Sequence, residues 1–105
     1  MAGDTEPVRA QGAQPHSRIG KSPKVVAREL GDGEGAVLLH LESGAYHGVN
    51  QVGLLVWELL DGERTVADII EAVHARVIDA PPQLEGDVMG FLDRVLERHL
   101  VMVVE

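Results

Sequence analysis

The apolar residues in the second half of the chain recur with the spacing of helices that bury one face. The first such run starts after Asn50, a residue type that often caps helix N-termini, and stops at Asp61 and Gly62. A helix is therefore predicted over residues 50–61, with Trp57 partly buried on the flank of its apolar stripe. That stripe comprises Val52, Leu55, Val56, Leu59 and Leu60.

A capping box predicts the start of a second helix. Thr65 and Asp68 are spaced so that a hydroxyl and a carboxylate can satisfy the free N–H groups of a first turn. This helix must end before Pro81 and Pro82, because proline lacks the helical donor and restricts the residue ahead of it. Its apolar stripe comprises Val66, Ile69, Ile70, Val73 and Val77.

A third helix is predicted from about residue 83 to residue 99. Its apolar stripe comprises Leu84, Val88, Phe91, Leu92, Val95 and Leu96. Gly86 and Gly90 weaken this helix by about 1 kcal/mol each relative to alanine. Two interpretations stay open: the glycines let another chain approach the helix closely, or the helix is loosely packed.

Three short extended runs precede the helices and predict strands over residues 24–30, 36–42 and 45–49. The middle run alternates its side chains as a strand with one well-buried face does. Tight connections between the runs predict an antiparallel meander. The expected fold class is α+β, with a three-stranded antiparallel sheet followed by three helices. The apolar residues 100–104 are expected to pack back as a short extended segment.

Residues 1–22 have a different composition, rich in Gly, Pro, Gln, Ala and Ser without apolar periodicity, which predicts a disordered tail. The remaining residues 23–105 are predicted to form one small domain. There is no cysteine, which excludes disulfides and thiolate chemistry and fits a reducing compartment. No apolar run resembles a signal peptide or a membrane span. We therefore expect a soluble cytoplasmic protein.

Charge is divided unevenly along the chain, whose net charge is −8. Residues 1–28 carry five basic and two acidic groups, whereas residues 29–105 carry four basic and 15 acidic groups. Nucleic-acid affinity depends largely on Lys and Arg that neutralise phosphates. The acidic domain is therefore a poor candidate for binding DNA or RNA.

Catalytic chemistry has little support in the residues. The five histidines show neither HxH nor HxxxH pairing, so no metal site is expected. The three serines fall in the tail or in a turn, which disfavours a serine nucleophile. We expect no catalytic residues, no metal and no cofactor, and hence a protein that is not an enzyme.

The run at residues 45–49 is the last strand of the meander and a candidate sheet edge. It contains no Lys, Pro or acidic residue, the usual devices that protect an edge from pairing with another chain. We interpret it as an edge kept open for an extended peptide to add as a further strand. The alternative is that a helix or the basic tail covers it.

A set of residues along the chain has a distinctive order and spacing: Tyr46, Val49, Asn50, Gly53, the run from 56 to 62, Thr65, Val66, Asp87, Val88, Phe91 and Leu92. In this order and spacing the sequence resembles the PqqD-like family. The resemblance covers residues 24 to 104. The family more often has Leu where Val49 stands, and a Gly near His99 before the closing Leu-Val.

The resemblance implies a winged-helix-like fold and a role as a recognition element for ribosomally made, post-translationally modified peptides. In that family the leader of the precursor peptide adds antiparallel to the third strand, opposite the third helix. Carried over to this sequence, the peptide-binding residues are Ala45, Tyr46, His47, Gly48, Val49, Val88, Phe91, Leu92 and Val95.

The implied partners are a precursor leader peptide and a maturation enzyme, without nucleic acid or membrane. A lasso-peptide pathway, in which the leader is delivered to a cysteine protease, is the favoured reading. One alternative is a pyrroloquinoline quinone-type peptide chaperone for a radical enzyme. Another is a winged-helix regulator that acts on DNA, which the scarcity of Lys and Arg in the second and third helices disfavours.

Overall fold

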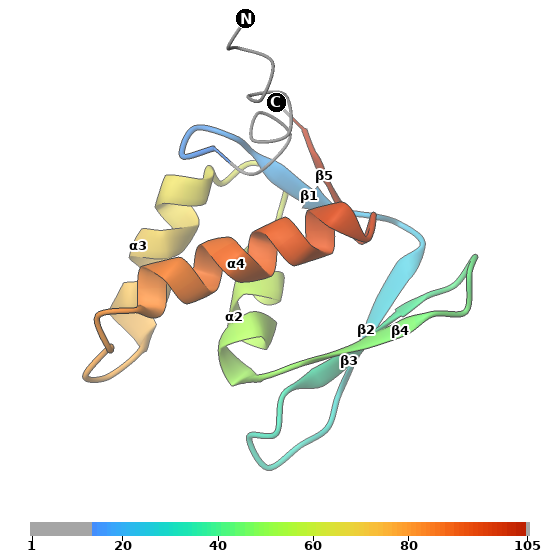
Figure 1. The fold of residues 1–105 in the computed structure, drawn as a ribbon, viewed down its shortest axis with the longest axis horizontal. Coiled ribbons are helices and arrows are strands. Elements are labelled where there is room, and N and C mark those ends of the chain that lie inside the picture. Colours follow the sequence, from blue (N-terminus) through green and yellow to red (C-terminus); the bar gives the residue numbers. More distant parts are fainter. Residues whose placement is uncertain (1–13, 105) are drawn as a thin grey trace, which may run out of the picture.

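The computed structural model describes residues 14–104, in which a three-stranded sheet and three helices form an α+β fold (Figure 1). The elements in chain order are β1 (Ile19–Lys21), β2 (Val25–Glu29), β3 (Ala36–His40), β4 (Tyr46–Val49), α2 (Gln51–Leu59), α3 (Val66–Arg76), α4 (Leu84–Glu97) and β5 (Val101–Val103). The predicted α+β class, antiparallel sheet and helix order are confirmed. The predicted strands and helices are each slightly shorter in the structure.

The main sheet has the order β2-β3-β4, and both strand pairs are antiparallel. Figure 1 shows this sheet projecting away from the helices, while β4 leads directly into α2. Ala36 and Leu38 on β3 are fully buried, so one face of the sheet packs toward the helices. Because β4 is the last strand in this order, it forms one edge of the sheet.

The prediction of a disordered tail through residue 22 is wrong for its last part. Residues 1–13 lie outside the described residues, but Ile19–Lys21 forms β1, which pairs antiparallel with β5. The Ile19 side chain is 0% exposed. The expectation that residues 100–104 pack back is confirmed by the same pairing. Burial of Ile19 and a strand partner 80 residues away order a segment whose own composition would not.

The N-terminal segment also completes the first turn of α3. The capping box is present as predicted, with Thr65 and Asp68 exchanging side-chain and backbone hydrogen bonds. Val66 N donates to Ser17 O at 2.9 Å, and Ala67 N donates to Pro15 O at 3.0 Å. The N–H groups that begin a helix are therefore satisfied without water or ligand.

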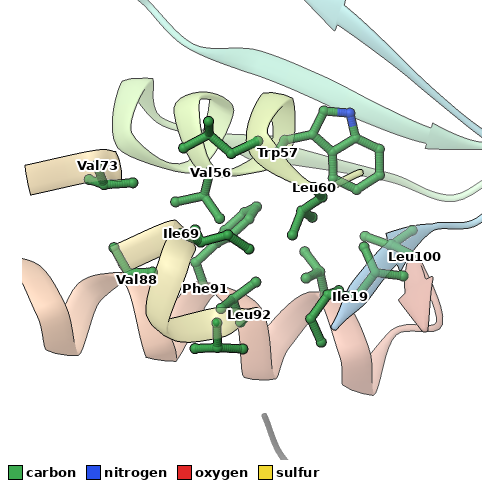
Figure 2. Close-up of a cluster of buried hydrophobic side chains, with 14 of the residues drawn as sticks. Ile19, Val56, Trp57, Leu60, Ile69, Val73, Val88, Phe91, Leu92 and Leu100 are labelled. Carbon is green, nitrogen blue, oxygen red and sulfur yellow. The ribbon is translucent and has the colours of Figure 1, made fainter. Parts of the chain in front are cut away.

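The core lies where α2, α3 and α4 meet the β1–β5 pair (Figure 2). Val56, Ile69, Leu92 and Leu100 are among its best-buried side chains. Trp57 is more deeply buried than expected, at 4% exposure, and lies beside Leu60 at one end of the cluster. Among residues 14–104, no helix is long and apolar enough to cross a bilayer.

Candidate peptide-binding groove

The outer edge of β4 is unpaired within the described residues. His40 N donates to Ala45 O at 2.9 Å, which fixes the phase of the β3–β4 ladder. Bonded and non-bonded pairs alternate in an antiparallel ladder, so His47 and Val49 direct their N–H and C=O groups toward β3. Of Ala45, the C=O group pairs with β3, whereas its N–H donates to Ser43 Oγ. Tyr46 and Gly48 therefore direct theirs outward. The sequence alone does not set this register.

The side chains of β4 alternate in the same way. His47 and Val49 are half-buried and lie on the face that carries buried Ala36 and Leu38. Tyr46 is 73% exposed and lies on the opposite face of the sheet. Only His47 and Val49 thus direct side chains from β4 toward the helices.

A groove of about 610 Å³ separates β4 from α4. Its floor comes from the start of α2, which Asn50 fixes by accepting a 2.8 Å hydrogen bond from Gly53 N. The lining residues are His47, Gly48, Val49, Asn50, Val52, Gly53, Gly86, Asp87, Gly90, Phe91, Arg94, Val95, Arg98 and Leu100. The groove therefore has a free strand edge along one side and a helix along the other.

The predicted site residues fall into three groups. Those that line the groove are His47, Gly48, Val49, Phe91 and Val95. Ala45 and Tyr46 lie on or next to the edge strand but outside this lining. Val88 and Leu92 are both 0% exposed, because they pack into the core on the side of α4 that faces away from the groove. All nine residues belong to or flank β4 and α4, but only five form the groove surface.

Sequence reasoning missed the charged part of the lining. Arg94 and Arg98 follow Gly86 and Gly90 at intervals of four residues. The first three residues lie on one face of α4, and Arg98 continues that face as the C-cap. Arg98 Nη1 lies 3.3 Å from His47 Nδ1 across the groove. A guanidinium can only donate, so the imidazole nitrogen accepts. The four-residue spacing is visible in the sequence, but it does not by itself distinguish a groove from a solvent-exposed helix face.

The groove has the chemistry of a binding surface. It offers backbone groups, apolar side chains and two guanidinium groups. Within residues 14–104, His, Asp and Glu form no cluster of three or more that could hold a metal ion. A second hollow, of about 790 Å³, lies on the outer face of the sheet and is lined in part by Val26, Leu39 and Tyr46.

Comparison with known proteins agrees with this architecture. The model of the family described as "Coenzyme PQQ synthesis protein D (PqqD)" matches residues 35–101. The solved structure "TbiB1 in Complex with the TbiA(beta) Leader Peptide" is 33% identical, with a TM-score of 0.63 over 78% of this chain and 93% of that chain. No protein among the curated ones matches.

A second structure, "Lasso peptide synthetase B1 complexed with the leader peptide", has a TM-score of 0.64 and covers 81% of this chain and 98% of that chain. Its sequence identity is 20%, so it bears on the fold alone. The family match spans more than half of the 105 residues and includes β3, β4 and all three helices. This chain belongs to the PqqD family.

Proposed function

We propose that this protein binds the leader segment of a ribosomally synthesised precursor peptide. The leader adds as an antiparallel strand to the free edge of β4, and its groove-facing side chains contact α4. The observation that carries the proposal is the unpaired edge of β4 bordering a groove of about 610 Å³. Backbone hydrogen bonds at such an edge give affinity, and the pocket beside it gives specificity.

The comparisons support this proposal. TbiB1, which is 33% identical, is described in complex with a leader peptide. The second structure, at 20% identity, supports the fold that places β4 beside α4 and adds nothing on function. Within the PqqD family we keep the lasso-type pathway favoured by the sequence resemblance, in which this protein delivers the leader to a cysteine protease. A pyrroloquinoline quinone-type chaperone for a radical enzyme is the alternative within the same family.

In this proposal the protein is a binding partner of an enzyme and not a catalyst. It acts in the cytoplasm, where ribosomes make the precursor, and needs no cofactor. The winged-helix-like arrangement implied by the resemblance stays a prediction. A role in DNA binding is disfavoured, because α4 carries four acidic residues against Arg94 within the helix and Arg98 at its C-cap.

A peptide-display selection tests this function. A library of random 16-residue peptides is panned on the immobilised protein, and the affinities of the selected peptides are measured by titration. Gly48→Pro removes one outward N–H, and the position has open space and no positive φ, so the fold should survive. We expect binding to fall at least tenfold in this variant.

Gly48→Ala is the matched control, because it adds a side chain at the same position and keeps the N–H. It should bind selected peptides as the unsubstituted protein does. If every selected peptide binds Gly48→Pro with unchanged affinity, β4 is not the docking edge and the proposed function fails.

A further inference from the structure

The side of α4 that faces the groove presents glycines in its N-terminal half and arginines toward its C-terminal end. Its N-terminal half presents Gly86 and Gly90, and a β-carbon added at Gly86 would meet no atom within 4 Å. Its C-terminal half presents Arg94 and Arg98. Arg94 lies back over Gly90, with Nη1 3.8 Å from the place of a β-carbon there. The Arg94 guanidinium therefore lies over Gly90 beside the groove.

These two arginines have no carboxylate partner among residues 14–104. The ion pairs there join Lys24 to Glu42 and Arg64 to Asp61. Arg98 instead contacts the imidazole of His47, which is no counter-ion. Residues 29–105 hold only four basic residues, and two of them line this groove. A pair of cations kept together in an acidic domain indicates an acidic ligand group.

The geometry also gives the direction of a bound strand. His47 lies opposite Arg98, whereas Val49 and Phe91 both approach the same side of Gly53. Along the groove, β4 and α4 therefore run in opposite directions. A peptide that adds antiparallel to β4 runs in the same direction as α4. Its N-terminal part lies by the glycines and its C-terminal part by the arginines.

The spacing along the peptide follows from element geometry. Phe91 and Arg98 are seven helical residues apart, or about 10 Å, which equals about three residues of an extended strand. Side chains that face the groove recur every second residue of a strand. A groove-facing acid would therefore stand two or four residues C-terminal to the apolar side chain that contacts Phe91.

We propose that the groove selects leader segments in which an acidic side chain follows the apolar anchor by two or four residues and pairs with Arg94 and Arg98. This inference rests on the proposed function and adds the chemistry and direction of the peptide. Asp87 lines the other end of the groove, so the reverse order of charges is disfavoured. A guanidinium can bind a carboxylate through two parallel N–H groups, which supplies geometric selectivity.

The same display library provides the test. Peptides whose binding is lost in Gly48→Pro are aligned on their apolar anchor. We expect Asp or Glu to be enriched two or four residues after it. Panning on the Arg94→Glu, Arg98→Glu double variant should replace this enrichment by Lys or Arg. Arg76→Glu, on exposed α3 surface outside the groove, is the matched control and should leave the acidic preference intact.

A single selected peptide gives an independent readout. Changing its acid to Gln should weaken binding about three- to tenfold on the unsubstituted protein. The same change should have little effect on binding to the Arg94→Gln, Arg98→Gln double variant, in which two exposed residues lose their charge. Edge-dependent peptides without any acidic preference would overturn this inference and leave the proposed function standing. A selection that yields no edge-dependent peptide would instead overturn the proposed function, and this inference with it.

Discussion

Gly53 on α2 lies directly against the ring of Phe91 on α4. A β-carbon at Gly53 would lie 3.1 Å from Phe91 Cε1 and 3.2 Å from Cδ1. The Cβ atom of Val49 on β4 would lie 3.2 Å from the same added β-carbon. This close approach brings the end of the edge strand, the start of α2 and the middle of α4 together at the groove floor.

Gly53→Ala should leave the protein folded but weaken peptide binding. Alanine gains about 1 kcal/mol of helix propensity, which offsets part of the steric cost. Phe91 lines the groove, so we expect its ring to shift into the groove and to occupy space that the peptide would otherwise fill. We expect a melting temperature within a few degrees of the unsubstituted protein and an affinity about tenfold lower. Unchanged affinity for a selected peptide would show that the ring moves elsewhere.

Gly86→Ala isolates the helix-propensity effect. The residue is in the same helix as Phe91, and an added β-carbon meets nothing within 4 Å. Chemical denaturation should show a gain of about 0.5–1 kcal/mol in the free energy of unfolding. A loss of stability would contradict a helical, unhindered backbone at Gly86.

Removing residues 1–21 should destabilise the domain. A chain that begins at Ser22 lacks Ile19, whose side chain is 0% exposed, and the strand partner of β5. Truncating a buried Ile typically costs about 2–5 kcal/mol. Thermal melts should therefore separate this variant clearly from the full chain. A chain that begins at Gln14 keeps both features and should melt near the full chain; equal melting of all three would contradict the docking of β1.

Trp57→Ala should cost about 3 kcal/mol, because Trp57 is 4% exposed within the core cluster. Trp57→Phe, which keeps a ring in the cavity, should cost less. Lys21 Nζ lies 5.5 Å from the centre of the Trp57 ring, so Lys21→Gln should cost under about 1 kcal/mol. Urea denaturation followed by circular dichroism measures all three. A near-zero cost for Trp57→Ala would place the ring outside the core.

The helices were predictable because each one carries its own signals. Asn50 and Thr65 cap helices as their sequence positions indicated, and the apolar stripe of α4 is buried as its spacing required. These features depend on residues within a few turns of one another, so local sequence suffices.

The parts that sequence reasoning missed depend on distant partners. β1 has three residues, and its pairing with Val101–Val103 leaves no local signature around Ile19. The phase of β4 depends on the turn before it, where His40 pairs with Ala45. Arg94 and Arg98 became candidates only when α4 was placed opposite His47, since a charged helix face alone usually means solvent exposure.

Hydrogen exchange of the β4 amides, measured by NMR with and without a selected peptide, tests the strand-addition account most directly. The amides of His47 and Val49 should be protected in both states, because they face β3. Those of Tyr46 and Gly48 should exchange quickly in the free protein and become protected when the peptide binds. Peptide binding that leaves Tyr46 and Gly48 exchanging as fast as before would contradict strand addition at β4.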